Sequence, residues 1–507
     1  MNPSNSKKTL TLESHQVRSF HRGLKILEKN FGAANNSGTG TGKTYLTMAK
    51  FLYSGYSMML CIVPAGSIIM WKEELSSHVI EHEIFSYSVI AGKNGKMNHP
   101  YLIKHDDEYF PTEALTNLIK RRILVVYDES QDVKNPKSNR TRACHAIAKE
   151  VVRVNNGSRL VSLSATPVDK EDYVESIIKL NGIITTNELF KYNPGLKEYQ
   201  MAGYGYEQLF TYCLRLNPKL THELYPKPLS AKMIRYSMFE LYTQIVKYEI
   251  AFAMPKPLID YKFNAYNKHY KLELDDLDRM KLGLQELKDL IRYQEDGSIN
   301  YRSDGIGKIV QSMIVMELSK VNLFYRLVTD TLNYIKGSKV ILYVWHDKTV
   351  DALMKKLEKY NPLRCDGKVS LSKRGEYRTL FQQDNDDYRL IVAKPTSFGK
   401  SISLHDTHGK RERFIFINPN FHFGPIVQAA GRAYRCGTKS DTHVYLTYAI
   451  GTDENKVMLA LSKKSEITRK CIASYIPDDD EETDLEELER IPDEVPFVDK
   501  WLYEYEN

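Results

Sequence analysis

Short apolar runs alternate with polar, helix-like stretches in two separate parts of the chain. In the first part, which ends near residue 180, the runs are Met58–Pro64, Ile123–Glu129 and Arg159–Pro167. In the second part, they are Lys339–Trp345, Arg389–Lys394, Arg413–Pro419 and His443–Ala449. Continuous apolar runs of this length are typical of buried parallel strands. The pattern therefore predicts an α/β fold with two open parallel sheets and helices between their strands.

The middle of the chain has a different pattern. Residues 187–319 contain few strand-like runs and many tyrosines, and the charged, amphipathic segment Lys271–Tyr293 predicts a helix. We interpret this region as a linker with a mainly helical insertion. The sequence then divides into four parts: a first α/β domain (1–186), the insertion (187–319), a second α/β domain (320–475) and an acidic tail (476–507).

Composition narrows the class of protein. At roughly 100–200 residues per domain, a chain of 507 residues can hold two or three globular units. Hydrophobic residues make up 42% and charged residues 27%, which excludes disordered, collagen-like and disulfide-scaffold proteins. No apolar run is long enough to cross a bilayer, and the N-terminus lacks an apolar signal core. We expect a non-secreted protein, cytoplasmic or nuclear, without membrane contacts and with reduced cysteines.

The net charge of +7 conceals an uneven distribution. Residues 478–507 hold fourteen acidic side chains and two basic ones, so residues 1–477 carry 69 basic against 50 acidic groups, a net charge of +19. Such an excess favours a polyanionic partner, although a well-solvated surface would also explain it. The acidic tail could compete with nucleic acid for a basic surface, but an inert solubilising tail is the favoured interpretation.

The strongest local motif comes before a helix-compatible run. It consists of Ser37, Gly38, Thr39, Gly40, Thr41, Gly42, Lys43 and Thr44. Glycines allow backbone N–H groups to turn towards phosphate oxygens, and the helix N-terminus adds positive potential. Lys43 can reach the β- and γ-phosphates, and the Thr44 hydroxyl can ligate Mg²⁺. The motif predicts a nucleotide-binding P-loop, although the strict pattern has glycine where Ser37 stands.

Two carboxylates follow the predicted strand at Ile123–Tyr127. Asp128 and Glu129 would lie at the carboxyl edge of a parallel sheet, where such sheets bind ligands. There Asp128 can hold Mg²⁺, and Glu129 can orient or deprotonate the attacking water. An acidic pair after a strand is often a helix cap instead, but its combination with a P-loop favours the catalytic interpretation.

Two arginines occur three residues apart near the other end of the chain. Arg432 and Arg435 belong to the run Gln428–Arg435, and a helix there would place both on one face. Guanidinium groups directed at a γ-phosphate stabilise the charge of the transition state. A solvated basic helix is the alternative for an isolated arginine pair.

In this order the segments resemble superfamily 2 helicases and translocases of the Swi/Snf-like type. Gln16 resembles the adenine-reading glutamine, Ser37–Thr44 motif I, and Asp128–Gln131 with Lys134 and Asn135 motif II. Val63, Pro64 and Trp71–Glu74 resemble motif Ia, which contacts the nucleic-acid backbone in that family. Ser164–Pro167 resembles motif III. The motif IV region is suggested by Val340–Trp345 together with Asp366, Gly367, Arg374 and Phe381. Thr396–Leu404 suggests motif V, and Gln428–Arg435 matches motif VI.

The resemblance also contains departures. Gln131 stands where family members usually have His or Asp, and the motif V segment keeps only one of the usual glycines. The compact size and the lysine-, asparagine- and tyrosine-rich character resemble motors of large DNA viruses or phages, including the poxvirus nucleoside triphosphatase and transcript-release helicase types.

The resemblance implies two tandem RecA-like domains that hydrolyse ATP between them and move along nucleic acid, either DNA or RNA, of which we favour DNA. It implies ATP and Mg²⁺ as ligands, with catalytic roles for Lys43, Asp128, Glu129, Gln428, Arg432 and Arg435. Contacts would be mainly to backbone phosphates, and transcription or replication machinery would be the protein partner. The competing hypothesis is a non-catalytic nucleic-acid scaffold that binds ATP. Tyrosines such as Tyr192, Tyr199, Tyr204 and Tyr206 could stack on bases, but packing of the insertion is favoured.

Overall fold

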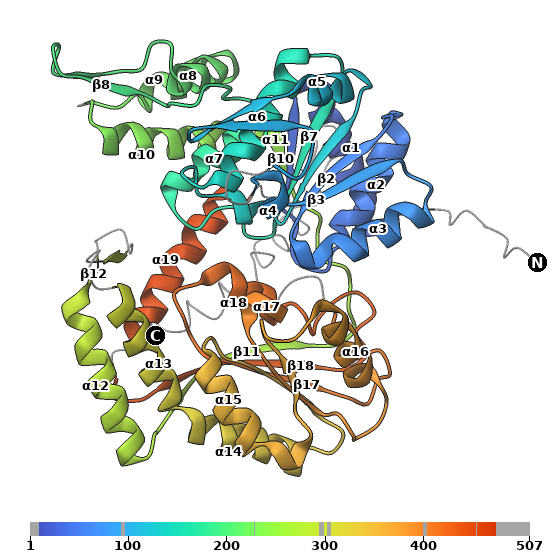
Figure 1. Ribbon diagram of the computed structural model, residues 1–507, viewed down its shortest axis with the longest axis vertical. Helices are drawn as coiled ribbons and strands as arrows, with labels where there is room; N and C mark the ends of the chain where they lie inside the picture. The colour runs from blue at the N-terminus through green and yellow to red at the C-terminus, as the bar shows by residue number, and fades with distance from the viewer. Residues whose placement is uncertain are drawn as a thin grey trace, which may run out of the picture. The chain divides into compact units, whose positions relative to one another are not determined.

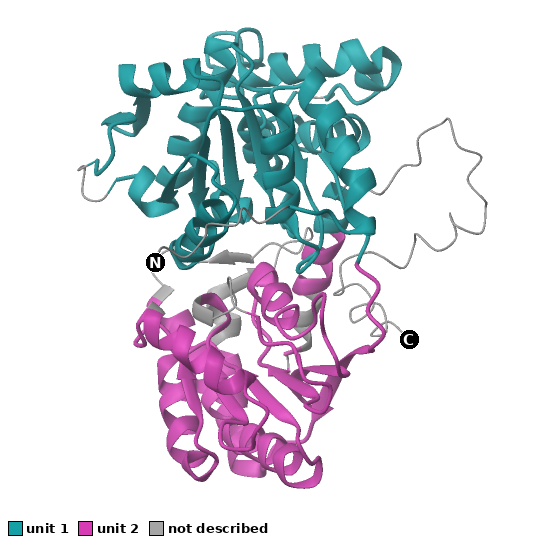
Figure 2. Ribbon diagram, turned by 90° about the vertical axis from the view of Figure 1, so that its right-hand side faces the viewer, with its two compact units in different colours: residues 1–256, 467–494 teal, residues 257–466, 495–507 magenta. Residues whose placement is uncertain are grey.

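The structure, a computed structural model, describes residues 10–92, 97–227, 229–293, 299–301, 306–398, 403–452 and 454–472. The chain forms two compact units, coloured separately in Figure 2. The first contains residues 1–256 and 467–494, and the second contains residues 257–466 and 495–507. The predicted acidic tail lies outside the described residues. No helix in the described part of the chain is long and apolar enough to span a membrane.

The first unit is built on a six-stranded sheet in which every neighbouring pair is parallel. The strands in spatial order are β10 (Ala251–Phe252), β1 (Gly32–Asn35), β7 (Arg159–Leu163), β6 (Leu124–Asp128), β2 (Met59–Val63) and β3 (His82–Ser86). Alternate residues enter different cores: Leu60 and Ile62 pack on one face, and Met59 and Cys61 on the other. This period of two is the geometry of a strand buried on both faces.

Helices cover both faces of the first sheet (Figure 1). One face packs against α1 (Ser14–Lys29), α2 (Lys43–Ser54) and α3 (Ile68–Ser77). The other face packs against α4 (Tyr87–Ile90), α5 (Glu113–Lys120) and α6 (Asn139–Val154). A separate hairpin of β4 (Leu102–His105) and β5 (Glu108–Pro111) precedes α5. The predicted helix after the P-loop is confirmed, and Gly55, with φ of 65°, follows its last residue.

The rest of the first unit forms its own apolar core. Its elements are α7 (Val174–Leu180), the hairpin β8 (Lys191–Asn193) and β9 (Glu198–Gln200), α8 (Gly205–Leu216), α9 (Pro218–Glu223), α10 (Ala231–Leu241), a π-helical turn (Tyr242–Val246) and α11 (Lys247–Ile250). Tyr206 is buried in this core, whereas Tyr192 is 46% exposed and its ring lies 5.1 Å from that of Tyr199. The hairpin lies at the upper left of Figure 1, where β8 is labelled.

The second unit repeats the architecture with another six-stranded, all-parallel sheet. Its strands in spatial order are β11 (Phe263–Tyr270), β18 (Thr442–Ala449), β17 (Arg413–Ile417), β14 (Lys339–Tyr343), β16 (Leu390–Ala393) and β15 (Leu363–Cys365). One face packs against α14 (Val321–Tyr334) and α15 (Asp347–Lys356). The other packs against α16 (Leu371–Gln382), α18 (Phe423–Ala430) and the first turns of α19 (Asn455–Cys471), whose residues from Ile467 onward belong to the first unit. Beside this sheet, α12 (Leu274–Leu290) packs on α13 (Ile306–Leu318), while β12 (Ile291–Tyr293) pairs with β13 (Ile299–Tyr301).

Two parallel-sheet α/β units confirm the predicted RecA-like fold class. The middle segment contributes to both units, because β10 completes the first sheet and β11 completes the second. The boundary between the units falls between Lys256 and Pro257, within that segment. The four-part division of the sequence stays a proposal about folding units.

Candidate active site

The P-loop follows strand β1 and leads directly into helix α2. Gly40 and Gly42 have φ of 82° and 88°, in the left-handed region that glycine tolerates. The Lys43 ammonium donates to the carbonyl oxygens of Ser37 at 2.9 Å and Gly38 at 2.8 Å. The loop therefore wraps around the lysine at the N-terminus of α2, where backbone N–H groups and the helix dipole favour an anion.

Ser37, which replaces the usual glycine, anchors the loop. Its side chain is buried, and its hydroxyl donates to the Asn35 side-chain oxygen. The same hydroxyl accepts a 2.7 Å hydrogen bond from the backbone N–H of Met254, next to strand β10. The serine hydroxyl thus connects the start of the P-loop to the end of β1 and to the segment that follows β10. A glycine has no side chain to make these bonds.

Gln16 holds the other side of the P-loop. Its Nε2 donates to the Thr41 carbonyl oxygen at 3.0 Å, and its Oε1 accepts from the Glu13 backbone N–H at 3.0 Å. A Cβ atom on Gly42 would lie 2.2 Å from this amide nitrogen, so no larger residue fits there without displacing Gln16. The amide therefore positions the loop; adenine reading by Gln16 stays a proposal.

The acidic pair lies at the carboxyl end of β6, two strands from the P-loop strand. Asp128 is 8% exposed, and its carboxylate accepts from Trp71 Nε1 at 2.8 Å and from the Glu129 backbone N–H at 3.0 Å. Burial, together with the charge of Glu129, raises the pKa of Asp128 above its usual value. The charge of Lys43 acts in the opposite direction, so the fold brings the P-loop lysine within electrostatic reach of this carboxylate.

Glu129 has a left-handed backbone with φ of 50° and ψ of 52°. This conformation is uncommon for residues other than glycine, and residues that adopt it cluster at functional sites. The Glu129 carboxylate accepts a 2.8 Å hydrogen bond from Gln131 Nε2, and Gln131 Oε1 accepts from the Ser164 hydroxyl. The glutamine that departs from the family pattern therefore connects motif II to motif III through both ends of its amide.

A second contact connects the same two segments. Lys134, in the last part of motif II, pairs with Asp169, two residues beyond motif III, at 2.6 Å. Strand order explains this proximity, because β7 lies between β1 and β6 and all three strands end at the same edge. The Ser164 backbone N–H also donates to the Asn35 carbonyl oxygen at 3.1 Å. Motifs I, II and III thus form one hydrogen-bonded site on the first unit.

Motif VI lies in the second unit, and one sequence-based argument about it is wrong. Helix α18 ends at Ala430, and Gly431 caps it, so Arg432 and Arg435 lie in the turns that follow rather than on a helical face. Gly431 keeps a right-handed backbone, with φ of −71° and ψ of 0°, so this helix end does not depend on a left-handed glycine. Gln428 remains on α18 and is 2% exposed.

The two motif VI arginines are nevertheless joined by the end of motif V. The Leu404 backbone N–H donates to the Arg432 carbonyl oxygen at 2.8 Å, and Arg435 Nη1 donates to the Ser403 hydroxyl at 2.9 Å. Arg432 is 3% exposed, and Arg435 is partly buried. Residues 399–402 of the predicted motif V lie outside the described residues.

Sequence reasoning assigned Trp71 to a nucleic-acid-binding motif and missed its contact with Asp128. The indole is fully buried and its hydrogen bond points it at Asp128, whereas the side chain of the next residue, Lys72, is exposed. A tryptophan directly before the charged run Lys72–Glu74 was the available signal, since indoles that are buried usually donate to a polar partner. The described residues contain no cluster of three His, Cys, Asp or Glu side chains arranged for a metal ion.

No family model matches the chain, but individual proteins are similar to it. The chain is 23% identical over 461 residues to an inferred ATP-dependent RNA helicase of Acanthamoeba polyphaga mimivirus, covering 87% of this chain and 80% of that protein. It is 22% identical over 444 residues to the Caenorhabditis elegans homologue of SWI/SNF-related matrix-associated actin-dependent regulator of chromatin subfamily A-like protein 1. That match covers 86% of this chain but only 58% of the relative.

A solved SWI2/SNF2 ATPase core from Sulfolobus solfataricus, in complex with dsDNA, aligns over 94% of this chain and 99% of that chain at 16% identity. Its TM-score is 0.31, so the fold assignment depends on the two sheets described above and not on this match. The chain is thus similar, over most of its length, to an inferred ATP-dependent RNA helicase and to a SWI/SNF-related protein.

Proposed function

We propose that this protein hydrolyses ATP at the interface of its two RecA-like domains and uses the energy to move along nucleic acid. One observation carries the proposal. The P-loop, the Asp128–Glu129 pair and motif III lie at the carboxyl ends of adjacent parallel strands and are joined by hydrogen bonds. Ligands of open α/β sheets bind at that edge.

The residues present suit ATP with Mg²⁺. The P-loop offers an ammonium and a helix N-terminus to phosphates, and Thr44 and Asp128 offer the hard oxygen ligands that Mg²⁺ takes. When bound, the metal neutralises charge on the β- and γ-phosphates. Glu129, held by Gln131, would orient or deprotonate the attacking water, while Lys43 would exchange its bonds to loop carbonyls for bonds to phosphate.

The arginines of the second unit complete this proposal. Arg432 and Arg435 would stabilise charge on the γ-phosphate when the domains close, with Gln428 as a further motif VI contact. ATP would then favour the closed form and ADP the open form. Each turnover would shift one domain relative to the other along a bound strand.

The partner we propose is nucleic acid, DNA rather than RNA, held mainly through backbone phosphates. The net charge of +19 on residues 1–477 supports this choice. The mimivirus relative is named for RNA and the dsDNA complex for DNA, so the polymer is a matter for experiment. A role in viral transcription or genome processing, in the host cytoplasm, nucleus or virion, agrees with the viral relative.

The test is ATP hydrolysis measured without polymer and with single-stranded DNA, double-stranded DNA or RNA. We expect a polymer to stimulate turnover, and we expect Glu129→Gln to lower kcat by about 10²–10³-fold because a water-activating group is removed. Lys43→Ala should abolish turnover by removing the phosphate-binding ammonium.

The alternatives give different results in the same assay. ATP binding without hydrolysis under any condition would favour the non-catalytic scaffold. Hydrolysis that no polymer stimulates would contradict translocation, even if both variants were inactive.

A further inference from the structure

A fully buried guanidinium contacts the end of motif V, the segment that also bonds to the motif VI arginines. Arg413, the first residue of β17, is 0% exposed. Its Nε donates to the Leu404 carbonyl oxygen at 2.8 Å, and its Nη1 donates to the Arg411 carbonyl oxygen at 2.6 Å. Burial of a charged group costs free energy unless the group is fully hydrogen-bonded. A buried arginine at this position therefore suggests a role other than packing.

Gln382, the last residue of α16, joins this guanidinium to the same segment. Its Oε1 accepts from Arg413 Nη2 at 3.2 Å, and its Nε2 donates to the Ser403 carbonyl oxygen at 3.1 Å. The consecutive carbonyl groups of Ser403 and Leu404 are therefore each held by one side chain, and the two side chains bond to each other.

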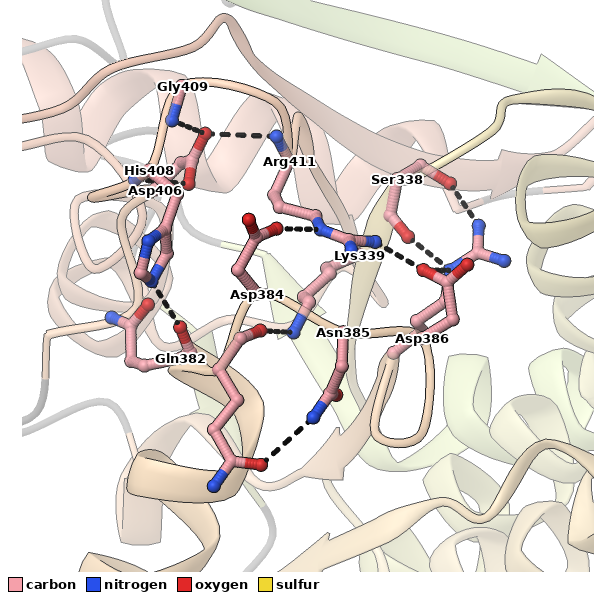
Figure 3. A network of polar contacts seen from close by, with 12 residues as sticks. Ser338, Lys339, Gln382, Asp384, Asn385, Asp386, Asp406, His408, Gly409 and Arg411 are labelled. Atoms are coloured by element: carbon pink, nitrogen blue, oxygen red, sulfur yellow. Dashed lines mark hydrogen bonds and ion pairs between the residues drawn. The ribbon is translucent and has the colours of Figure 1, made fainter.

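Charged groups surround this arrangement, and the Asp406 carboxylate lies 4.0 Å from Arg413. The same carboxylate accepts from the backbone N–H groups of His408, Gly409 and Arg411 at 3.0 Å each (Figure 3). Arg411 in turn pairs with Asp384 at 2.8 Å. The loop that follows motif V is thus closed on itself, and it cannot move without breaking these bonds.

Ser403 and Leu404 are also the residues that contact the motif VI arginines. Ser403 accepts from the Arg435 side chain, and Leu404 donates to the Arg432 backbone, as described above. One continuous path of hydrogen bonds therefore runs from Gln382 through Ser403 to the guanidinium of Arg435.

We propose that Gln382 and Arg413 are positioning residues for motif VI: they set the place of Ser403–Leu404 and thereby the direction of the Arg435 side chain. The proposal rests on the proposed function, in which Arg435 acts on the γ-phosphate. Simple packing of the α16 terminus is the competing explanation. It predicts that loss of the Gln382 amide changes stability without a selective effect on turnover.

Two adjacent glutamines provide a matched test. Gln383 is exposed, and its side chain accepts only a 3.1 Å bond from Asn385 among the contacts of the described residues. Gln382→Leu should lower polymer-stimulated kcat about tenfold, because bonds that align Arg435 in the transition state are lost. The KM for ATP should stay within about twofold, since the P-loop lies in the other unit. Gln383→Leu should match the wild type in both constants.

Graded variants separate positioning from packing. Gln382→Glu keeps the acceptor for Arg413 but loses the donor to Ser403, so its kcat should fall between those of Gln382→Leu and the wild type. Ser403→Ala removes only the hydroxyl that accepts from Arg435 and should also lower kcat with KM unchanged; it serves as the second variant if Gln382→Leu does not fold. Melting temperatures of all variants identify any loss of folded protein.

The outcomes distinguish this inference from the proposed function. If the wild type hydrolyses ATP in a polymer-stimulated manner and Gln382→Leu and Ser403→Ala behave like Gln383→Leu, the positioning role is wrong. If kcat falls only in step with the melting temperature, packing explains the contacts. If the wild type does not hydrolyse ATP, the proposed function itself has failed.

Discussion

At the scale of single residues, the site depends on side chains that the motif pattern left unexplained. Trp71 donates to Asp128, and Gln131 bridges Glu129 and Ser164. The Trp71–Asp128 and Gln131–Ser164 contacts join residues far apart in the sequence, so spacing alone does not predict them. The candidate nucleotide-binding residues of the P-loop, in contrast, could be proposed from the sequence. A P-loop is a local structure whose chemistry depends on adjacent residues.

Lys50 is a buried lysine that the proposed chemistry does not use. It lies on α2, is 1% exposed, and its ammonium lies 3.7 Å from the centre of the Phe252 ring. Desolvation lowers its pKa well below the usual value, and no charged group in the described part of the chain counters that effect. Burial of this amine therefore opposes folding at neutral pH.

We predict that Lys50→Met raises the free energy of unfolding by about 1–3 kcal/mol at pH 7. Because the folded-state pKa is lowered, the unfolded state binds the extra proton, and the wild type gains stability as pH rises towards the unfolded pKa. The advantage of Lys50→Met should therefore shrink at pH 10. Urea unfolding at both pH values measures it, with the exposed Lys29→Met as control. An advantage that is equal at both pH values would contradict this account.

At the scale of elements, two glycines show how backbone conformation determines whether a glycine ends a helix or lies within one. Gly55 ends α2 with φ of 65°, whereas Gly375 lies inside α16. A Cβ atom at either position would meet nothing within 4 Å. The two glycines therefore differ in backbone conformation and not in packing.

We predict opposite effects for the same substitution. Gly55→Ala should destabilise the first unit by about 1–2 kcal/mol, because an L-residue is strained in the left-handed region. Gly375→Ala should stabilise the second unit by about 1 kcal/mol, since alanine is the better helix former. Scanning calorimetry measures the transition of each unit. Shifts in the same direction would show that the backbone of Gly55 relaxes on substitution.

Predictions of elements from apolar runs succeeded where strands are buried on both faces. The strands β2, β6, β7, β14, β16, β17 and β18 all lie within or next to the predicted runs. The pattern did not single out β11, because this edge strand contains Asn, Lys and His among its apolar residues without regular alternation and is only partly buried. The short edge strand β10 has too few residues to form a pattern.

At the scale of the whole molecule, charge governs the proposed interaction with nucleic acid. Residues 1–477 carry a net charge of +19, and the thirty residues after them carry a net charge of −12. Contacts to backbone phosphates release counterions, so we predict that the logarithm of the binding constant falls linearly with the logarithm of salt concentration.

Fluorescence anisotropy with labelled DNA and RNA measures this dependence. A chain ending at Pro477 should bind with the same affinity as the full chain if the tail is inert. Tighter binding, with the largest difference at low salt, would instead support an autoinhibitory tail. An affinity that is indifferent to salt would contradict recognition through phosphates.

The order of the motifs, the two parallel sheets and the candidate nucleotide ligands could be inferred from the sequence, because they depend on local patterns and on burial. The location of Arg432 and Arg435 beyond the end of a helix, the contact of Trp71 with Asp128 and the support of Ser403–Leu404 by Gln382 and Arg413 could not. These features arise where distant segments meet at a sheet edge. Hydrogen bonds formed there depend on strand order and helix termination, which no spacing along the chain encodes.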